Sequence, residues 1–255
     1  MTSFAGWKVL VTGASRGIGA ACARALLQRG AAVALVGRDE EALEAVAGAP
    51  GEALVLAADL ADGEARDRVV ERAAETLGGL DGLALCAGVA MHRPFEALDE
   101  GVLRRQLDLN FVTPLMMVQR ALPHLSERGS VVFVGSSLAD RPAPATTAYA
   151  ASKAALHNAT RQLAVELRPI RVNCVSPGVV DTAMARALRL APGEPEPRGD
   201  ELDERVSAQL DALRSLHPLG RLGTPEEIAA AVLYLLGAAW TTGTILTVDG
   251  GLTAG

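Results

Sequence analysis

A tyrosine and a lysine that stand four residues apart could carry acid-base chemistry. Tyr149 and Lys153 lie in a segment of helical period, so both side chains should project from one helix face. A free tyrosine has a pKa of about 10, and an ammonium group held close would lower it. Lys153 and Lys8 are the only lysines of the chain, in which arginine supplies the other positive charges. We therefore interpret Tyr149 and Lys153 as an acid-base centre rather than as a core tyrosine and a surface charge.

A glycine-rich turn near the N-terminus predicts a dinucleotide site. Residues 12–19 read TGASRGIG, between a strand-like run and an Ala-rich helical segment. Gly13, Gly17 and Gly19 would let the backbone turn sharply and approach a ligand, while the helix N-terminus offers N–H groups to a pyrophosphate. The spacing matches neither the usual G-x-G-x-x-G fingerprint nor a P-loop, which would need a lysine here.

The elements that must position these residues form a regular alternation of apolar runs and helical segments. This pattern predicts an α/β fold, a doubly wound parallel seven-stranded sheet with helices on both faces (Rossmann-like). A length of 255 residues fits one domain over 1–255. The expected strands are 8–12, 32–36, 53–57, 82–86, 130–135, 171–175 and 244–248, and the clearest helices are 20–29, 63–77, 102–122, 148–167 and 225–236.

One segment departs from this alternation. Residues 191–200 read APGEPEPRGD, which predicts an exposed loop between helical stretches at 182–190 and 201–215. Ligands of open α/β sheets bind outside the carboxyl ends of the strands, so we expect 182–215 to cover a substrate. A solvated surface insertion is the alternative.

Composition argues against several classes of protein. Hydrophobic residues make up 49% of the chain and charged residues 21%, which excludes a largely disordered protein. The net charge of -6 without a basic stripe argues against a nucleic-acid partner. The spacing of the three cysteines and four histidines predicts no disulfide framework and no metal site. Without a signal peptide or a long apolar run, we expect a cytoplasmic protein with no membrane partner.

Five short motifs, in order along essentially the whole chain, resemble the short-chain dehydrogenase/reductase family. They are TGASRGIG at 12–19, LCAG at 85–88, YAASK at 149–153, SPG at 176–178 and VDGG at 248–251. The stretch HPLGRLGTPEE at 217–227 is similar to the 3-oxoacyl-[acyl-carrier-protein] reductase branch, although sugar, steroid and alcohol dehydrogenases share it. The resemblance implies hydride transfer between nicotinamide and a carbonyl or secondary alcohol, in a homotetramer or a dimer.

The resemblance also assigns catalytic roles. Tyr149 would give a proton to the carbonyl oxygen, or accept it in oxidation, and Lys153 would also hydrogen-bond the nicotinamide ribose. A serine thirteen positions before the tyrosine would bind the substrate oxygen, which selects Ser136, with the adjacent Ser137 as the alternative. Asn110 matches the helix asparagine that supports a proton relay.

The cofactor residues implied by the resemblance come from four segments. One departure stands out, because Leu85 and Cys86 replace two asparagines that the family commonly has, so a polar contact that orders this loop must be replaced or absent. Besides Tyr149 and Lys153, the set is Gly13, Ser15, Arg16, Gly17, Ile18 and Gly19 in the phosphate loop, Asp59 and Leu60 at the adenine, Ala87 and Gly88 near the adenosine ribose, and Pro177, Gly178, Val180 and Thr182 at the carboxamide.

Two arginines and a missing carboxylate predict NADP(H) over NAD(H). An acidic residue at the end of the second strand would bind the adenosine ribose and repel the extra phosphate of NADP. Gly37 stands there instead, and Arg38 and Arg16 could reach the 2′-phosphate. The next two residues, Asp39 and Glu40, are interpreted as the N-cap and first turn of a helix.

Two other functions stay open. A cofactor-sensing regulatory protein would keep the fold without turnover, but it would not need a tuned proton donor. An epimerase or dehydratase would use nicotinamide transiently, although such relatives are generally longer. The substrate is expected to be a small carbonyl or alcohol, and no charged anchor for a carboxylate stands out. Arg128 and Arg168 could meet an acidic carrier protein that presents it, with solvated surface charges as the alternative.

Overall fold

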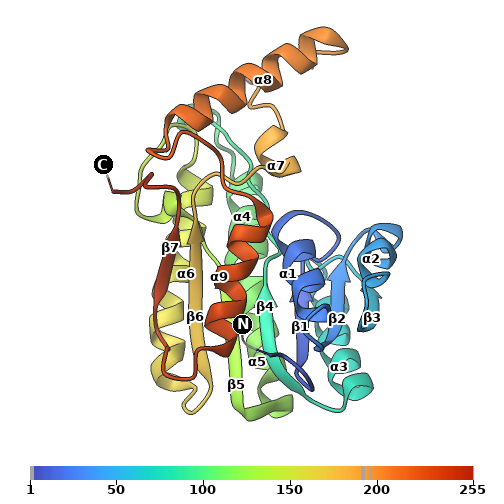
Figure 1. Cartoon of the computed structure of the whole chain (residues 1–255). Coiled ribbons are helices and arrows are strands. Elements are labelled where there is room, and N and C mark those ends of the chain that lie inside the picture. The colour runs from blue at the N-terminus through green and yellow to red at the C-terminus, as the bar shows by residue number, and fades with distance from the viewer. Residues whose placement is uncertain (1–2, 191–192, 196, 255) are drawn as a thin grey trace.

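The computed structural model describes residues 3–190, 193–195 and 197–254, and these form one seven-stranded sheet (Figure 1). All neighbouring strands are parallel, in the order β3-β2-β1-β4-β5-β6-β7. The predicted fold is confirmed. The strands are β1 (Lys8–Thr12), β2 (Ala32–Gly37), β3 (Glu52–Ala57), β4 (Leu80–Leu85), β5 (Leu125–Val134), β6 (Arg171–Pro177) and β7 (Ile245–Val248).

Helices cover both faces of the sheet, which explains why most strands are apolar along their length. One large core cluster joins α1, α2 and α9 to one face, and another joins α3, α5 and α6 to the other. The helices are α1 (Gly17–Leu27), α2 (Glu40–Ala47), α3 (Gly63–Leu77), α4 (Glu100–Leu107), α5 (Thr113–Ala121), α6 (Thr147–Glu166), α7 (Ala183–Arg186), α8 (Asp200–Ser215) and α9 (Pro225–Gly237).

The strand order fixes where a ligand can bind. Chain connections lead outward from β1 to β2 and β3 on one side, and from β4 to β7 on the other. The crevice of such a sheet lies at the carboxyl ends of the two central strands, here β1 and β4. The phosphate loop follows β1, so the fold brings it to this crevice.

Several predicted elements differ from the structure. The helix predicted over 102–122 is divided by a π-helical turn, Asp108–Val112, between α4 and α5. β4 begins at Leu80, and β5 already begins at Leu125, because a bulge separates the pair Leu80 and Leu125 from the pair Gly82 and Ser130.

The helix predicted over 182–190 is wrong beyond its first half. α7 ends at Arg186, and the backbone of Ala187 is extended. The reason lies in α8, where Gln209 Nε2 donates to the carbonyls of Ala185 (2.9 Å) and Ala187 (3.1 Å). The Oε1 of Gln209 accepts the N–H of Arg189 at 3.1 Å, so one amide side chain completes the end of α7.

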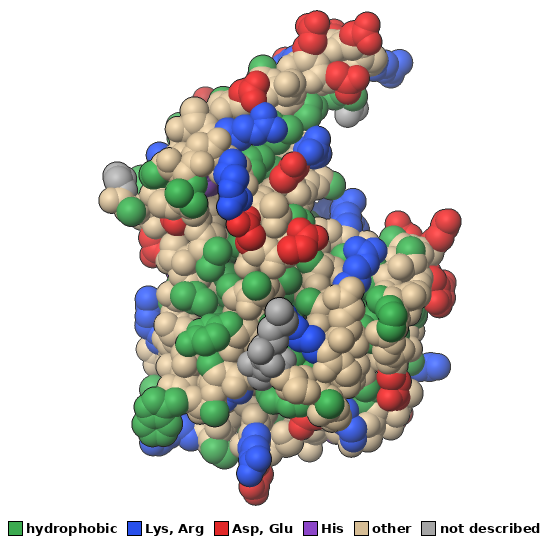
Figure 2. Space-filling view, viewed as in Figure 1, with side chains coloured by type: hydrophobic (Ala, Val, Ile, Leu, Met, Phe, Trp, Pro, Cys, Tyr) green, Lys and Arg blue, Asp and Glu red, His purple; other side chains and the backbone are tan. Residues whose placement is uncertain are grey.

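The segment from α7 to α8 stands beyond the carboxyl ends of the strands (Figure 1). A small separate cluster of Ala185, Leu210, Leu213 and Leu222 holds it. Of the loop predicted over 191–200, residues 191, 192 and 196 lie outside the described residues, and 193–195 and 197–199 form no helix or strand. Acidic side chains gather at the projecting end of α8 (Figure 2), where its first turn is acidic and stabilises the helix N-terminus.

Within the described residues, no helix is both long and apolar enough to span a membrane.

Candidate active site

A cavity of about 180 Å³ opens at the carboxyl ends of the strands. It lies between the phosphate loop, the turn after β6, the start of α6 and the covering segment. The structure brings together here nine of the predicted site residues, together with the alternative serine Ser137. The nine are Ile18, Gly88, Ser136, Tyr149, Lys153, Pro177, Gly178, Val180 and Thr182.

Ser136 and Tyr149 meet inside this cavity. Ser136 follows β5, and its hydroxyl lies near the phenol of Tyr149 of α6. Burial raises the pKa of Tyr149, and the polar side chain of Ser136 partly opposes that shift. Ser137 lines the same cavity, but of the two serines only Ser136 affects the pKa of the phenol. Of the two serines, Ser136 is therefore the partner of Tyr149.

Lys153 is buried one helical turn after Tyr149. Its ammonium donates to the carbonyl of Val134 at 2.7 Å and lies 5.9 Å from the centre of the tyrosine ring. Burial lowers the pKa of Lys153 to about 8. The expectation that Lys153 lowers the pKa of Tyr149 is wrong for this structure, because burial of the phenol dominates and the ammonium is directed at Val134. The phenol stays protonated at neutral pH, as a proton donor requires.

Asn110 lies behind the cavity, in the π-helical turn. It is buried, its Oδ1 accepts the N–H of Val89 at 2.8 Å, and its Nδ2 donates to Val89 O at 2.9 Å and to Ser152 Oγ at 3.1 Å. A Cβ on Gly88 would lie 3.0 Å from Asn110 Oδ1 and 3.6 Å from Lys153 Nζ. Asn110 therefore fixes the loop after β4 and keeps Gly88 against the lysine.

The phosphate loop needs its glycines for close packing. A Cβ on Gly19 would lie 2.3 Å from the carbonyl oxygen of Gly13. Gly17 has a φ of +57°, and its Cβ would lie 3.3 Å from Thr182 Cγ2. Gly13 has a φ of +65° and packs against the backbone of Ala87. A Cβ on Gly13 would lie 3.1 Å from the Cα and N of Ala87. The loop thus adjoins the turns after β4 and β6, with room for a backbone-bound ligand rather than for side chains.

The loop after β4 is ordered without the two family asparagines. The N–H of Ala87 donates to Thr12 Oγ1 at 3.0 Å, and Asn110 holds both polar groups of Val89. Cys86 is half-buried, and its thiol, together with burial, raises the pKa of Cys22. The missing amides are therefore replaced by Thr12 and Asn110.

The phosphate loop also packs against the end of β2. The N–H of Ala14 donates to the carbonyl of Val36 at 3.0 Å, and a Cβ on Gly37 would lie 3.3 Å from Ser15 Oγ. Arg16 and Arg38 are both exposed beside this contact. As predicted, Asp39 is the N-cap of α2 and accepts the N–H of Ala42 at 3.1 Å.

Asp59 and Leu60 follow β3. Asp59 is exposed and accepts the N–H of Ala61 at 3.0 Å, whereas Leu60 is buried. Leu60 also accepts a hydrogen bond from Thr113 at 3.2 Å through its carbonyl. Both residues lie outside the cavity lining, on the side of β2 and β3.

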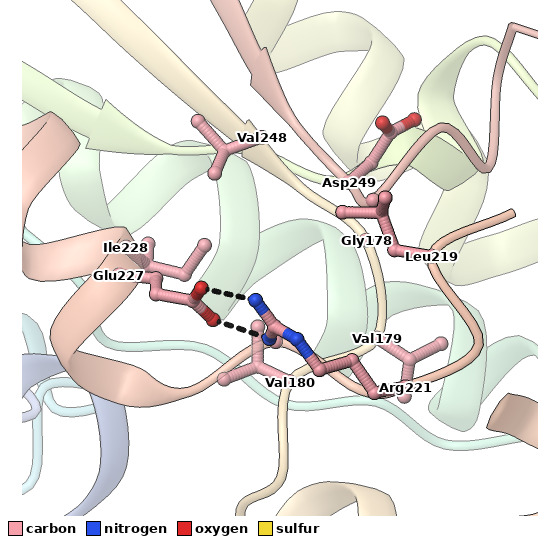
Figure 3. A pocket seen from close by; sticks show the side chains of 11 residues that line it. Gly178, Val179, Val180, Leu219, Arg221, Glu227, Ile228, Val248 and Asp249 are labelled. Carbon is pink, nitrogen blue, oxygen red and sulfur yellow. Dashed lines mark hydrogen bonds and ion pairs between the residues drawn. The ribbon is translucent and has the colours of Figure 1, made fainter. Parts of the chain in front are cut away.

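A second, smaller hollow lies behind the turn after β6 (Figure 3). There Arg221 and Glu227 face each other in a two-bonded ion pair of 2.6 and 2.8 Å, which lowers the pKa of Glu227 to about 2. The N–H of Val179 donates to His217 Nε2 at 3.1 Å, and His217 Nδ1 bonds the carbonyl of Leu213 at 2.9 Å. These contacts fix the turn beside Thr182 and link it to α8.

Three basic residues of the main cavity were missed from the sequence. His92, Arg141 and Arg189 all line it, although they are far apart in the chain and share no motif. Arg189 lies in the segment predicted to cover the substrate, which is the only signal that could have drawn attention to it. Arg128 and Arg168, in contrast, lie at the amino ends of β5 and β6, at the opposite edge of the sheet, so they do not flank the cavity.

Known proteins resemble this chain along nearly all of its length. A family model described as "Enoyl-(Acyl carrier protein) reductase" matches residues 13–253. Cis-4-hydroxycyclohexanecarboxylate dehydrogenase of Sinomonas cyclohexanicum is 36% identical over 263 residues, covering 99% of this chain and 98% of the relative. An uncharacterised oxidoreductase of Methylorubrum extorquens is 36% identical over 261 residues, covering 99% of this chain and all (100%) of the relative.

Solved structures agree. A short-chain dehydrogenase from Burkholderia cenocepacia in complex with NADP is 35% identical, with a TM-score of 0.84, covering 99% of this chain and 100% of that one. A short-chain dehydrogenase/reductase from Serratia marcescens is 36% identical, with a TM-score of 0.86 and the same coverage of 99% and 100%. The sequence motifs, the fold and these matches lead to one conclusion: this chain belongs to the short-chain dehydrogenase/reductase family of nicotinamide-dependent oxidoreductases.

Proposed function

We propose that this protein is an NADP(H)-dependent oxidoreductase that interconverts a small carbonyl compound and its secondary alcohol, with Tyr149 as proton donor or acceptor. The observation that carries the proposal is the meeting of Ser136 and Tyr149 in one cavity that also reaches Lys153, Ile18 and Thr182. The bound nicotinamide would supply or accept the hydride. The Sinomonas relative, whose name describes a dehydrogenase of a hydroxycyclohexane compound, supports the secondary alcohol.

The chain's own residues act on the substrate oxygen. The hydroxyls of Ser136 and Tyr149 would both donate to a carbonyl oxygen held between them, and they would stabilise the charge that grows there during reduction. Tyr149 then transfers its proton to that oxygen, which its raised pKa allows because the phenol is protonated beforehand. Lys153 would turn from the carbonyl of Val134 toward a ribose hydroxyl of the cofactor. Asn110 would hold the loop after β4 in place through its hydrogen bond to Val89.

The cofactor fits the groups that surround the cavity. Gly13, Gly17 and Gly19, with Ser15 and Ile18, would hold the pyrophosphate against the N-terminus of α1. Arg16 and Arg38 would bind the 2′-phosphate, which favours NADP(H), and the NADP complex of the Burkholderia relative supports this choice. We assign Asp59 and Leu60 to the adenine, Ala87 and Gly88 to the adenosine ribose, and Pro177, Gly178, Val180 and Thr182 to the carboxamide.

The covering segment and the assembly complete the proposal. Met184 of α7 and Leu213 of α8 line the cavity, which supports 182–215 as a substrate cover. We propose a homotetramer, supported by the exposed apolar side chains of Val165 on α6 and Trp240 after α9. A cytoplasmic location is supported by three free thiols.

The direct test is NADPH consumption with a panel of ketones. We expect one NADPH oxidised for each carbonyl reduced, with the alcohol identified as product and no change without ketone. A protein that binds NADPH but consumes none with any ketone, and reduces no NADP+ with the matching alcohols, would instead be a cofactor-sensing protein.

A further inference from the structure

The main cavity is positively charged in a chain that is negative overall. Its described lining includes the cationic side chains Arg141, Lys153 and Arg189, and no aspartate or glutamate. The whole chain carries a net charge of -6. Lys153 belongs to the reacting end, which leaves Arg141 and Arg189 without a role in the proposed chemistry. An excess of positive charge in a cleft attracts anionic ligands.

Within the described residues, the guanidinium of Arg189 has no carboxylate partner, and the same holds for Arg141, the other arginine of the lining. Arg189 is exposed at the mouth of the cavity, yet partial burial lowers its pKa. Four other arginines of the region 181–227 are instead engaged in ion pairs, Arg186 with Asp181, Arg205 with Glu194, Arg214 with Asp211 and Arg221 with Glu227.

The backbone that carries Arg189 is held in place. Gln209 of α8 accepts its N–H at 3.1 Å and donates to the carbonyls of Ala185 and Ala187. The guanidinium therefore extends from a fixed point rather than from a free loop. A pre-positioned cation loses less entropy on binding a ligand.

His92 also lines the cavity and has a buried ring nitrogen that makes no hydrogen bond to the described residues. Its Nδ1 is buried without a hydrogen-bond partner among the described residues, which is uncommon for a buried polar atom. Burial, then the positive charges of Arg189 and Arg93, lower the pKa of His92 to about 4. At neutral pH the ring is uncharged, so it can donate one hydrogen bond without repelling Arg189.

We propose that Arg189, with His92 and Arg141, binds a carboxylate of the substrate, so that the enzyme acts on small oxo acids or hydroxy acids. This inference rests on the proposed function for the reacting end, where Ser136 and Tyr149 hold the oxygen. A guanidinium binds a carboxylate through two parallel hydrogen bonds, and a neutral imidazole can add a third. The apolar lining residues Leu138, Ala143, Met184, Leu213 and Leu216 suit a hydrocarbon spacer between the two polar ends.

Binding to the NADP+-saturated enzyme tests this inference without requiring turnover. The probes are levulinate and its longer straight-chain homologues, each beside its neutral primary amide, measured by isothermal titration. We expect at least one acid to bind roughly tenfold more tightly than its amide, the gain typical of hydrogen bonds to a charged group. Arg189→Gln should remove that difference while leaving the amide and NADP+ affinities within about twofold.

Further variants guard against a folding artefact. Arg189→Lys keeps the charge but loses the paired hydrogen bonds, so it should retain part of the preference. His92→Leu should reduce it by roughly threefold, as expected for one neutral hydrogen bond. Arg72→Gln, an exposed change on α3, is the matched control and should change nothing.

Two results would overturn the carboxylate site. One is equal binding of acid and amide at every length, and the other is an Arg189→Gln variant that loses NADP+ affinity but not acid preference. Hydride transfer is measured in a separate assay, as NADPH consumption. Arg189-dependent binding of acids with no turnover would refute the proposed oxidoreductase activity but support the carboxylate site. Turnover of neutral ketones with no preference for acids would support the oxidoreductase activity but refute the carboxylate site.

Discussion

Burial shifts the pKa values of Tyr149 and Lys153 in opposite directions. It raises the pKa of Tyr149 and lowers that of Lys153 to about 8, because both charged forms lose solvation. The protonated phenol suits carbonyl reduction. Among the described residues, the buried ammonium of Lys153 donates a hydrogen bond only to Val134. Its burial lowers the stability of the folded protein, which we expect to be the cost of a group that serves the cofactor.

That cost predicts the effect of Lys153→Met on folding. Below pH 8 the lysine is charged in both states, and its burial destabilises the native chain. Between about pH 8 and 10.5 the unfolded state binds the extra proton, so wild-type stability rises with pH relative to the variant. Allowing for the lost bond to Val134, we expect the variant to be more stable by about 2 kcal/mol at pH 7. Urea unfolding across this pH range would show the difference shrinking as pH rises, and a less stable variant at pH 7 would contradict it.

Arg38 should determine cofactor choice. It is exposed beside the phosphate loop, where Gly37 leaves no carboxylate to repel a 2′-phosphate. We expect kcat/KM to favour NADPH over NADH, and Arg38→Ala to lower the NADPH value by roughly tenfold, as for a lost charged hydrogen bond, with NADH little changed. Equal kcat/KM values of the wild type with NADPH and NADH would show that Arg38 and Arg16 do not bind the 2′-phosphate.

At the scale of elements, the phosphate loop depends on one contact. An added methyl at Gly19 would meet the carbonyl of Gly13 at 2.3 Å, and the backbone would have to move. We expect Gly19→Ala to weaken NADPH binding by more than about tenfold, since the N–H groups would leave their positions. Gly48→Ala is the matched control, because its Cβ meets only atoms at 3.8 Å. Fluorescence titration measures both, and unchanged NADPH affinity in Gly19→Ala would exclude this loop as the binding site.

The elements predicted best are those in which the pattern of apolar residues along the sequence matches the faces that the fold buries. β1, β2 and β3 were found within a residue, because strands covered on both faces have continuous apolar runs. The end of α7 could not be predicted, since it is set by Gln209 more than twenty residues later. For the same reason His92, Arg141 and Arg189 were missed, whereas Tyr149 and Lys153, one helical turn apart, could be predicted from their spacing, the scarcity of lysine and the family motif.

For the whole molecule, exposed apolar side chains predict self-association. Val165 on α6 is 63% exposed and Trp240 is fully (100%) exposed, although neither lines the cavity. We expect light scattering to give the mass of four chains, and Val165→Glu to lower it by placing charge in the α6 interface. A monomer at micromolar concentration would refute the assembly.

The central claim is that the Tyr149 hydroxyl transfers the proton while the rest of the site holds the cofactor. The most direct measurement is kcat/KM of Tyr149→Phe with the best ketone of the panel, beside its Kd for NADPH. We predict a loss of roughly a hundredfold or more in kcat/KM, the usual contribution of general acid catalysis, with Kd within about twofold. A variant that keeps its rate within about tenfold of wild type would contradict the mechanism.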